Sequence, residues 1–209
     1  MTTRTLDGPS DRERTDVARL ADLFDDGPDI VIQADFFTAG ESARIFEQLK
    51  AQIRWRQDVM RFGRREVPQP RLTAWYGDDG KTYVYSGINN HPLPWTALLL
   101  ALRAKAEHFA ESTFNSVLLN YYRDGGDSVG WHADNEPVLG ERPVIASLSF
   151  GATRTFELRR RTTGKVAKLP LTSGSILVMR GTTQHDWVHR VPKEPGSASR
   201  INLTFRFVY

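Results

Sequence analysis

Two residues in the stretch GWHADNEP, Gly130 to Pro137, are suited to binding a metal ion together. On an extended segment, residues i and i+2 point to the same side, so the imidazole of His132 and the carboxylate of Asp134 would face a common point. A histidine that merely hydrogen-bonds a nearby aspartate gives the same pattern. A third ligand is therefore needed to decide between the two interpretations.

The third ligand must be a histidine, an aspartate or a glutamate, because the chain contains no cysteine. The candidates are His185 and His189 in the stretch TTQHDWVHRVP. Two histidines and one carboxylate that leave coordination positions open are the ligands of non-haem iron(II) oxygenases. Zinc accepts the same ligands, so these residues by themselves leave the identity of the metal open.

The final stretch RINLTFRFVY alternates strictly between polar and apolar residues. On a strand, Arg200, Asn202, Thr204 and Arg206 would share one face, opposite an apolar face. The two arginines lie about 20 Å apart along such a strand, and a gap of about 6–7 Å remains if both side chains lean inward. A five-carbon diacid fits this gap, with one carboxylate on each guanidinium. A solvent-facing strand would also alternate, but this polar face lacks the Lys and Glu that such strands usually include.

A second polar face lies in the stretch LLNYYRDGG, where Asn120 and Tyr122 stand two residues apart. Their amide and hydroxyl groups are hydrogen-bond donors. Both point to one side of a strand, so they could join the arginines in binding the same ligand.

These side chains need regular elements to position them. Thr38 and Glu41 have the spacing of a capping box for a helix that reaches about Gln52, and a second helix is expected over residues 94–113. Val17 to Phe24 could form a further helical turn or two. The expected strands are residues 29–37, 115–122, 144–150, 154–159, 175–180, 187–191 and 200–209, with the β-prone segments LTAWYG and TYVYSG around a DDG turn. Helices followed by many short strands predict an α+β fold with a double-stranded β-helix, or jelly-roll, core.

Composition narrows the class of protein. The 209 residues are 40% hydrophobic and 25% charged, which suits a globular protein with one domain. No apolar run approaches the ~20 residues of a membrane span, and the N-terminal stretch lacks the apolar core of a signal peptide. We therefore expect a cytoplasmic protein, or a nuclear one in a eukaryotic host. Residues 1–28 are expected to form a polar, partly flexible extension, and residues 29–209 a single domain whose β-helix core spans 115–209.

The net charge of +3 hides an asymmetry. Residues 1–29 hold four Arg against eight Asp and Glu, a net charge of −4, so residues 30–209 carry +7. Seven basic residues lie between Lys50 and Arg71, and six lie between Gly151 and Pro170. A basic folded body favours polyanions such as nucleic acid, although an ordinary solvated surface can give the same counts.

Several motifs together resemble the AlkB family of Fe(II)/2-oxoglutarate dioxygenases, and most closely its AlkB homologue 2-like branch, which repairs alkylated double-stranded DNA. The resemblance runs from about residue 55 to the C-terminus. The motifs, in the family's order, are PRLTAWYGD, YSG, NYYRDGGDSVGWHADNE, IASLSFGATRTF, SGSILVM, WVHRVP and RINLTFR. The resemblance implies a jelly-roll core, with helices and a nucleotide-recognition lid in residues 29–114.

The same resemblance implies a role for the residues singled out above. The iron ligands would be His132, Asp134 and His189, because the family pattern has its ligand directly after WV, and His185 is left over. The implied contacts to 2-oxoglutarate are Asn120, Tyr122, Arg200, Asn202, Thr204 and Arg206.

The implied reaction is the oxidative demethylation of N-alkylated bases in DNA. 2-Oxoglutarate is decarboxylated to succinate and CO2 with O2 as the oxidant, an N-methyl group is hydroxylated, and the product collapses to formaldehyde and the restored base. A base within a duplex must be flipped out to reach the iron. We therefore expect alkylated, double-stranded DNA as the partner of a monomeric protein.

A flipped base leaves a gap that an aromatic side chain can fill. Phe62, in VMRFGRREVPQPR, lies among basic residues and resembles the finger that the double-strand branch inserts into a duplex, although an isolated Phe more often packs in a core. The other implied contacts are Tyr85 and Ser86 on the flipped base, Asn135 and Glu136 at its edge, and Arg71 at a phosphate. The family has Phe at the position of Tyr85, and this departure keeps the ring.

Two alternatives stay open. The same chemistry could act on RNA or on another methylated substrate, such as a protein side chain. The chain could also be a non-enzymatic β-helix module that binds nucleic acid and holds a metal only structurally. Consumption of 2-oxoglutarate in the presence of Fe(II) would separate an enzyme from such a module.

Overall fold

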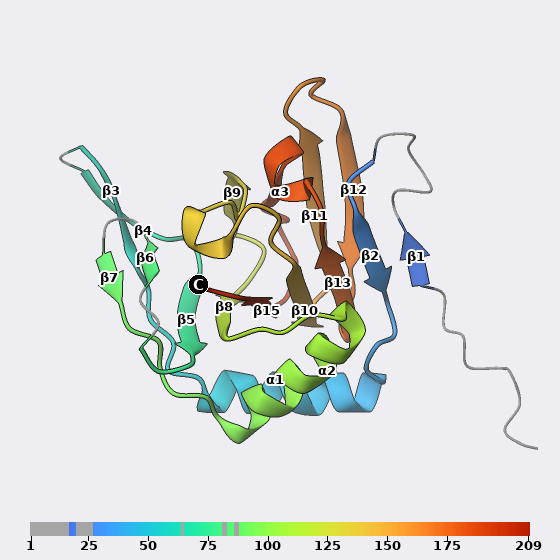
Figure 1. The fold of residues 1–209 in the computed structure, drawn as a ribbon. Helices are drawn as coiled ribbons and strands as arrows, with labels where there is room; N and C mark the ends of the chain where they lie inside the picture. The colour runs from blue at the N-terminus through green and yellow to red at the C-terminus, as the bar shows by residue number, and fades with distance from the viewer. Residues whose placement is uncertain (1–16, 20–26, 64, 81–82, 86–87) are drawn as a thin grey trace, which may run out of the picture.

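The computed structural model describes residues 17–19, 27–63, 65–80, 83–85 and 88–209, and shows two β-sheets packed face to face (Figure 1). Within the described chain, the larger sheet has the order β1 (Val17–Arg19), β2 (Ile30–Gln33), β13 (Ser175–Met179), β10 (Ile145–Gly151), β15 (Arg200–Arg206), β8 (Ser116–Tyr122), β5 (Leu72–Gly77). The smaller sheet has the order β12 (Val166–Leu171), β11 (Arg154–Arg160), β14 (Trp187–Val191), β9 (Val129–His132). This arrangement confirms the predicted α+β fold with a jelly-roll core.

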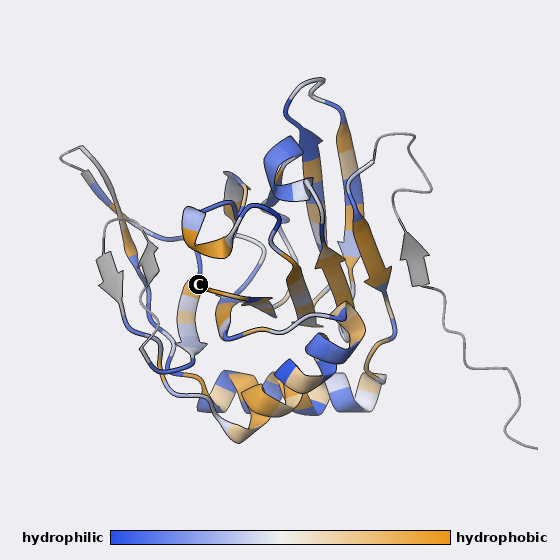
Figure 2. Cartoon of the chain, in the orientation of Figure 1, coloured by the Kyte–Doolittle hydropathy of each residue, from blue (hydrophilic) through white to orange (hydrophobic). Residues whose placement is uncertain are grey.

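Two helices cover the outer face of the larger sheet (Figure 1). Helix α1 (Ala39–Gln52) begins at the predicted capping box, in which Thr38 Oγ1 accepts the Glu41 N–H and Glu41 Oε2 accepts the Thr38 N–H at 2.9 Å. Helix α2 (Ala97–Ala110) begins after Thr96, whose side chain also caps it. Hydrophobic residues alternate with hydrophilic ones along both helices and are concentrated along strands such as β2 and β13 (Figure 2).

Strand β15 lies between two environments, and its alternation assigns one set of side chains to each. Ile201, Leu203 and Phe205 are fully buried in the core formed with the helices. The alternate polar residues face the smaller sheet, so the functional groups lie between the two sheets. Phe207, the next apolar residue in the alternation, lies beyond the end of the strand and is 37% exposed.

Two antiparallel hairpins lie beside β5, outside the two sheets (Figure 1). They are β3 (Val59–Phe62) with β4 (Arg65–Pro68), and β6 (Tyr83–Tyr85) with β7 (Ile88–Asn90). The first hairpin projects from the body of the protein and coincides with the expected finger. The remaining short elements are η2 (Pro137–Leu139) and α3 (Thr183–Asp186).

Some predicted elements were wrong in type or extent. Val17–Arg19 pairs with β2 as an edge strand and does not form a helical turn, whereas residues 20–24 lie outside the described residues. Strand β12 was missed, because its lysine and proline disguise an edge strand. The strand expected over 29–37 ends at Gln33, and that over 200–209 ends at Arg206. No helix in the described part of the chain is long and apolar enough to cross a membrane.

Candidate active site

His132, Asp134 and His189 meet between the two sheets. His132 ends β9, His189 lies in β14, and antiparallel pairing places the two residues opposite each other. One potential ligand atom from each of the three side chains lies within 4.8 Å of the others. The histidine ring centroids are 4.3 Å apart, and Nε2 of His132 is 3.9 Å from Oδ1 of Asp134. Two imidazoles and one carboxylate arranged in this way fit a divalent iron ion.

His185, the other candidate ligand, is separate from this group. It lies on α3, and its Nε2 contacts the carbonyl oxygen of Glu141. The structure therefore brings His189, and not His185, to the first two ligands.

The charges around the cluster favour metal binding. Burial, with a smaller repulsion from His132, lowers the pKa of His189 to about 3, so this imidazole is neutral near pH 7, as a metal ligand must be. Burial alone would raise the pKa of Asp134, but the Arg206 guanidinium and the histidines outweigh it and hold that pKa well below its usual range. Nδ1 of His132 lies 2.8 Å from the Gly130 carbonyl oxygen, so a proton on Nδ1 leaves Nε2 for the metal.

The two carboxylate oxygens of Asp134 have different neighbours. Nη2 of Arg206 donates to Oδ2 at 2.7 Å, whereas Oδ1 is the oxygen near His132. A buried cation thus orients one oxygen and leaves the other for a metal. We expected Arg206 to bind the cosubstrate. In this structure its guanidinium contacts the metal ligand Asp134, and the contact of Arg206 with a cosubstrate stays a prediction.

A cavity of about 130 Å³ extends from the cluster between the sheets. The predicted cosubstrate residues in its wall are Asn120, Arg200, Asn202, Thr204 and Arg206. Arg200 is 1% exposed, and its Nη2 donates to Ser149 Oγ at 2.9 Å. Among the described residues, its Nε and Nη1 have no hydrogen-bond partner. A buried guanidinium with unsatisfied donors fits the carboxylate of a ligand such as 2-oxoglutarate.

Three other predicted cosubstrate residues make contacts within the protein. Asn202 Nδ2 donates to Ser147 Oγ at 2.8 Å, and Thr204 Oγ1 donates to Asn202 Oδ1 at 3.1 Å. Tyr122 is 2% exposed, and its ring centroid lies 5.3 Å from the guanidinium carbon of Arg200. Asn202, Thr204 and Tyr122 therefore support the cavity wall, and their contacts to a cosubstrate stay predictions.

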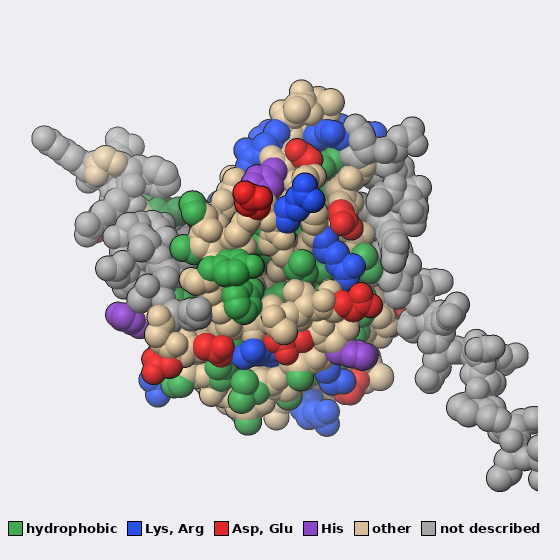
Figure 3. All heavy atoms as spheres, viewed as in Figure 1, with side chains coloured by type: hydrophobic (Ala, Val, Ile, Leu, Met, Phe, Trp, Pro, Cys, Tyr) green, Lys and Arg blue, Asp and Glu red, His purple; other side chains and the backbone are tan. Residues whose placement is uncertain are grey.

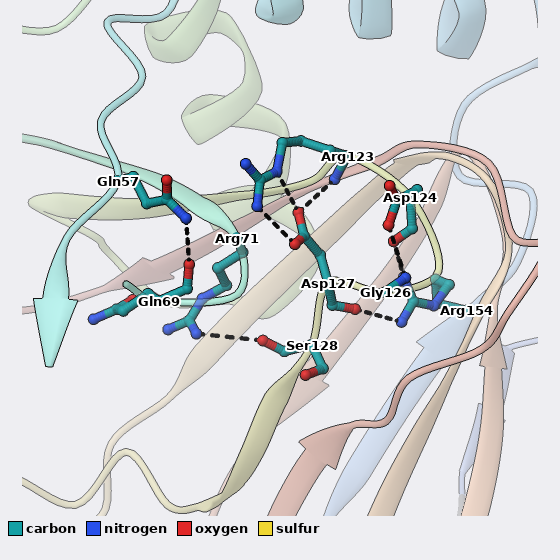
Figure 4. A network of polar contacts seen from close by, with 9 residues as sticks. All are labelled: Gln57, Gln69, Arg71, Arg123, Asp124, Gly126, Asp127, Ser128 and Arg154. Atoms are coloured by element: carbon teal, nitrogen blue, oxygen red, sulfur yellow. Dashed lines mark hydrogen bonds and ion pairs between the residues drawn. The ribbon is translucent and has the colours of Figure 1, made fainter. Parts of the chain in front are cut away.

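The loop between β8 and β9 joins the cosubstrate residues to the metal ligands and is held from several sides (Figure 4). The Asp127 carboxylate accepts hydrogen bonds from the backbone and the guanidinium of Arg123 at 2.8–2.9 Å. Arg154 of β11 is fully buried, and its Nη2 donates to the Asp127 carbonyl at 2.9 Å. Gly125 approaches the connection between β14 and β15 so closely that a Cβ would lie 1.7 Å from the Glu194 carbonyl oxygen. These contacts fix the relative position of the two halves of the site.

Arg71 lies inside the cavity wall. It is 5% exposed, its Nε donates to Asn120 Oδ1 at 2.6 Å, and its Nη1 reaches the Ser128 carbonyl oxygen at 3.5 Å. A side chain buried in this way faces a group within the cavity more readily than a phosphate on the outer surface. The phosphate contact that we expected for Arg71 stays a prediction.

The structure describes only some of the other residues that we expected to contact nucleic acid. Glu136 lines the cavity, and its Oε2 is buried without a hydrogen-bond partner among the described residues. Asn135 is exposed. The backbones of Phe62 and Tyr85 end β3 and β6, but their side chains, like the whole of Ser86, lie outside the described residues.

Sequence reasoning missed several groups around the site. Ser147 and Ser149 of β10 bond to the polar face of β15, and the alternation in IASLSF is a signal that could have found them. Gln184 is 1% exposed and accepts the backbone N–H of Asp134. No local pattern identifies Gln184, because its partner is distant in the sequence.

Comparisons with known proteins agree with this geometry. The model of the 2OG-Fe(II) oxygenase superfamily matches residues 29–206. A solved structure of OsALKBH1 has a TM-score of 0.63 at 18% identity, and the match covers 87% of this chain and 97% of that one. At this identity the likeness shows the fold alone.

Two kinds of relative are similar in sequence. The mouse alpha-ketoglutarate-dependent dioxygenase alkB homolog 3 is 48% identical over 86% of this chain and 66% of its own length. The human DNA oxidative demethylase ALKBH2 is 38% identical over 81% of this chain and 70% of its own length. The chain thus spans slightly less than two thirds of the homolog 3 protein, which is the more similar of the two.

We expected the greatest similarity to the homologue 2-like branch, but the homolog 3 relative, at 48% identity, is more similar than the ALKBH2 relative, at 38%. The superfamily match implies iron(II) and 2-oxoglutarate as cofactors, and His132, Asp134 and His189 form a possible iron site. The chain therefore belongs to the AlkB family of the 2OG-Fe(II) oxygenase superfamily.

Proposed function

We propose that this protein removes N-alkyl groups oxidatively from bases of DNA, with iron(II), 2-oxoglutarate and O2. One observation carries the proposal: a single cavity holds three metal ligands, the buried guanidinium of Arg200 and the unsatisfied carboxylate oxygen of Glu136. The name of a 38% identical relative, DNA oxidative demethylase, supports the same reaction class.

Bound iron(II) would supply the oxidation, in which O2 decarboxylates 2-oxoglutarate to succinate and CO2 and hydroxylates an N-methyl group of the base. The protein's own residues hold and orient the reactants. His132, Asp134 and His189 bind the metal on one side and leave positions open on the other. Arg200 binds the distant carboxylate of the cosubstrate through charge-assisted hydrogen bonds. The C–N bond of the hydroxymethylated base then breaks, formaldehyde leaves, and the hydroxyl proton passes to the freed nitrogen or to solvent.

The charge distribution supports a nucleic-acid partner. Residues 30–209 carry a net charge of +7. Lys and Arg side chains gather at the top of the face in Figure 3, where Figure 1 places the turn between β11 and β12. The β3–β4 hairpin projects from the body and carries Phe62 beside its turn. We propose double-stranded DNA as the substrate, with this hairpin entering the duplex where the base has left it.

Mass spectrometry of oligonucleotides that carry one N-methylated adenine or cytosine tests the proposal. Wild-type protein with Fe(II), 2-oxoglutarate and O2 should remove the methyl group and release succinate and formaldehyde, and His132→Ala should do neither. Comparison of the demethylation of single-stranded DNA, duplex DNA and RNA of one sequence shows which of these polymers is the substrate. Turnover of 2-oxoglutarate without demethylation of any of them would contradict the substrate class, and absence of turnover would contradict the enzyme.

A further inference from the structure

The metal ligand Asp134 is attached to the fold by a side chain that the proposed chemistry does not use. Asp134 lies beyond the end of β9, past the pairing of His132 with His189. Its backbone N–H donates to Oε1 of Gln184 at 2.9 Å. Gln184 is 1% exposed and Asp134 is 6% exposed, so this hydrogen bond is shielded from water.

The other end of the Gln184 side chain is also fixed. Its Nε2 donates to the sulfur of Met179 at 3.2 Å, and Met179 ends β13 in the wall of the cavity. Both polar atoms of the amide are therefore used, which holds the side chain in one orientation. Gln184 bridges the cavity wall and the backbone of a metal ligand.

The next residue of α3 holds the same loop at a different place. His185 contacts the carbonyl oxygen of Glu141, farther along the connection between β9 and β10. Helix α3 thus attaches this loop twice, once at the metal ligand and once away from it. Variants of Gln184 and His185 can therefore be compared to separate support of the metal ligand from attachment of the loop in general.

We propose that Gln184 is a positioning residue for the metal site. It fixes the backbone of Asp134 so that Oδ1 faces the histidines while Oδ2 stays on Arg206. Without Gln184, a buried N–H would lack its acceptor, and the backbone would shift to find another, moving the carboxylate with it. The proposal rests on the metal site that the proposed function requires, and it is independent of the nucleic-acid substrate.

Binding of Mn(II) to the full chain, followed by the electron paramagnetic resonance signal of the free ion, tests this proposal without 2-oxoglutarate or nucleic acid. Gln184→Leu removes the acceptor at similar volume and should weaken binding about 10–100-fold, the usual effect of losing such an outer contact. Gln184→Glu keeps an oxygen at the same place and should recover most of the affinity. His185→Ala should bind Mn(II) like the wild type.

Melting temperatures of the metal-free variants are measured alongside, and Gln184→Met replaces Gln184→Leu if the latter does not fold. Unchanged affinity in the variant that lacks the oxygen overturns the proposal. Equal losses in that variant and in His185→Ala also overturn it, because general attachment of the loop would then explain both. Wild-type protein that fails to bind Mn(II), or binds it equally after His132→Ala, refutes the metal site itself, and so the proposed function.

Discussion

Replacement of Arg200 by Met should weaken 2-oxoglutarate binding strongly without destabilising the protein. Arg200 is 1% exposed, and two of its three guanidinium nitrogens have no hydrogen-bond partner among the described residues. Burial lowers the pKa of this guanidinium, and the opposing effects of Tyr122 and Glu194 do not offset it. A ligand carboxylate would supply the missing partner.

The size of the effect follows from the hydrogen bonds that are lost. Bonds to a charged group contribute about 1.5–3 kcal/mol, which corresponds to a roughly 10- to 100-fold weaker affinity for 2-oxoglutarate. The stability of the protein without 2-oxoglutarate should not fall with the affinity. Arg200→Met removes a buried charge whose Nε and Nη1 have no hydrogen-bond partner among the described residues, so the melting temperature should stay constant or rise. If Arg200 served only the fold, its replacement would instead lower the melting temperature.

Calorimetric titration of 2-oxoglutarate into Mn(II)-loaded protein measures the affinity, with the melting temperature of the free protein recorded beside it. Arg206→Met is the matched control, because Arg206 also holds the metal ligand Asp134. It should therefore weaken Mn(II) binding as well, whereas Arg200→Met should leave Mn(II) binding unchanged. Normal 2-oxoglutarate affinity in Arg200→Met, or a lower melting temperature with equal loss of both ligands, would refute the reasoning.

Three further predictions concern the metal ligands, the role of Phe62 and the pH dependence of stability. His132→Ala should abolish Mn(II) binding in the resonance assay and His185→Ala should not, since only the former belongs to the cluster; loss in His185→Ala alone would contradict the ligand assignment. Phe62→Ala should lower demethylation of duplex DNA about tenfold or more and of a single strand little, because stacking worth about 1–3 kcal/mol matters only where a base leaves a duplex. Equal losses on both substrates, measured by mass spectrometry, would show that Phe62 serves packing. For Glu157, burial raises the pKa, but hydrogen bonds from Arg190 and a lysine lower it overall. Its stabilisation is present above the unfolded pKa of 4.5 and is lost as the pH falls through the lower folded value. Urea unfolding below pH 4.5 should therefore show a steeper loss of unfolding free energy in wild type than in Glu157→Gln, and parallel curves would contradict this account.

Local patterns in the sequence determined those features that depend on neighbouring residues. The alternation in RINLTFR correctly placed Arg200 and Arg206 on the cavity face, because a strand turns successive side chains to opposite sides. The spacing of Thr38 and Glu41 correctly placed the start of α1, because a capping box closes within one helical turn. The pairing of His132 with Asp134 was equally local.

Tertiary structure decided which distant groups join those local patterns. The residues alone left His185 and His189 equivalent, and only the register between β9 and β14 puts His189 opposite His132. The same holds for the salt bridge of Arg206 with Asp134 and for Gln184 beneath the Asp134 backbone. No short-range pattern encodes such contacts, because they depend on how strands far apart in the chain pair and on how the two sheets pack together.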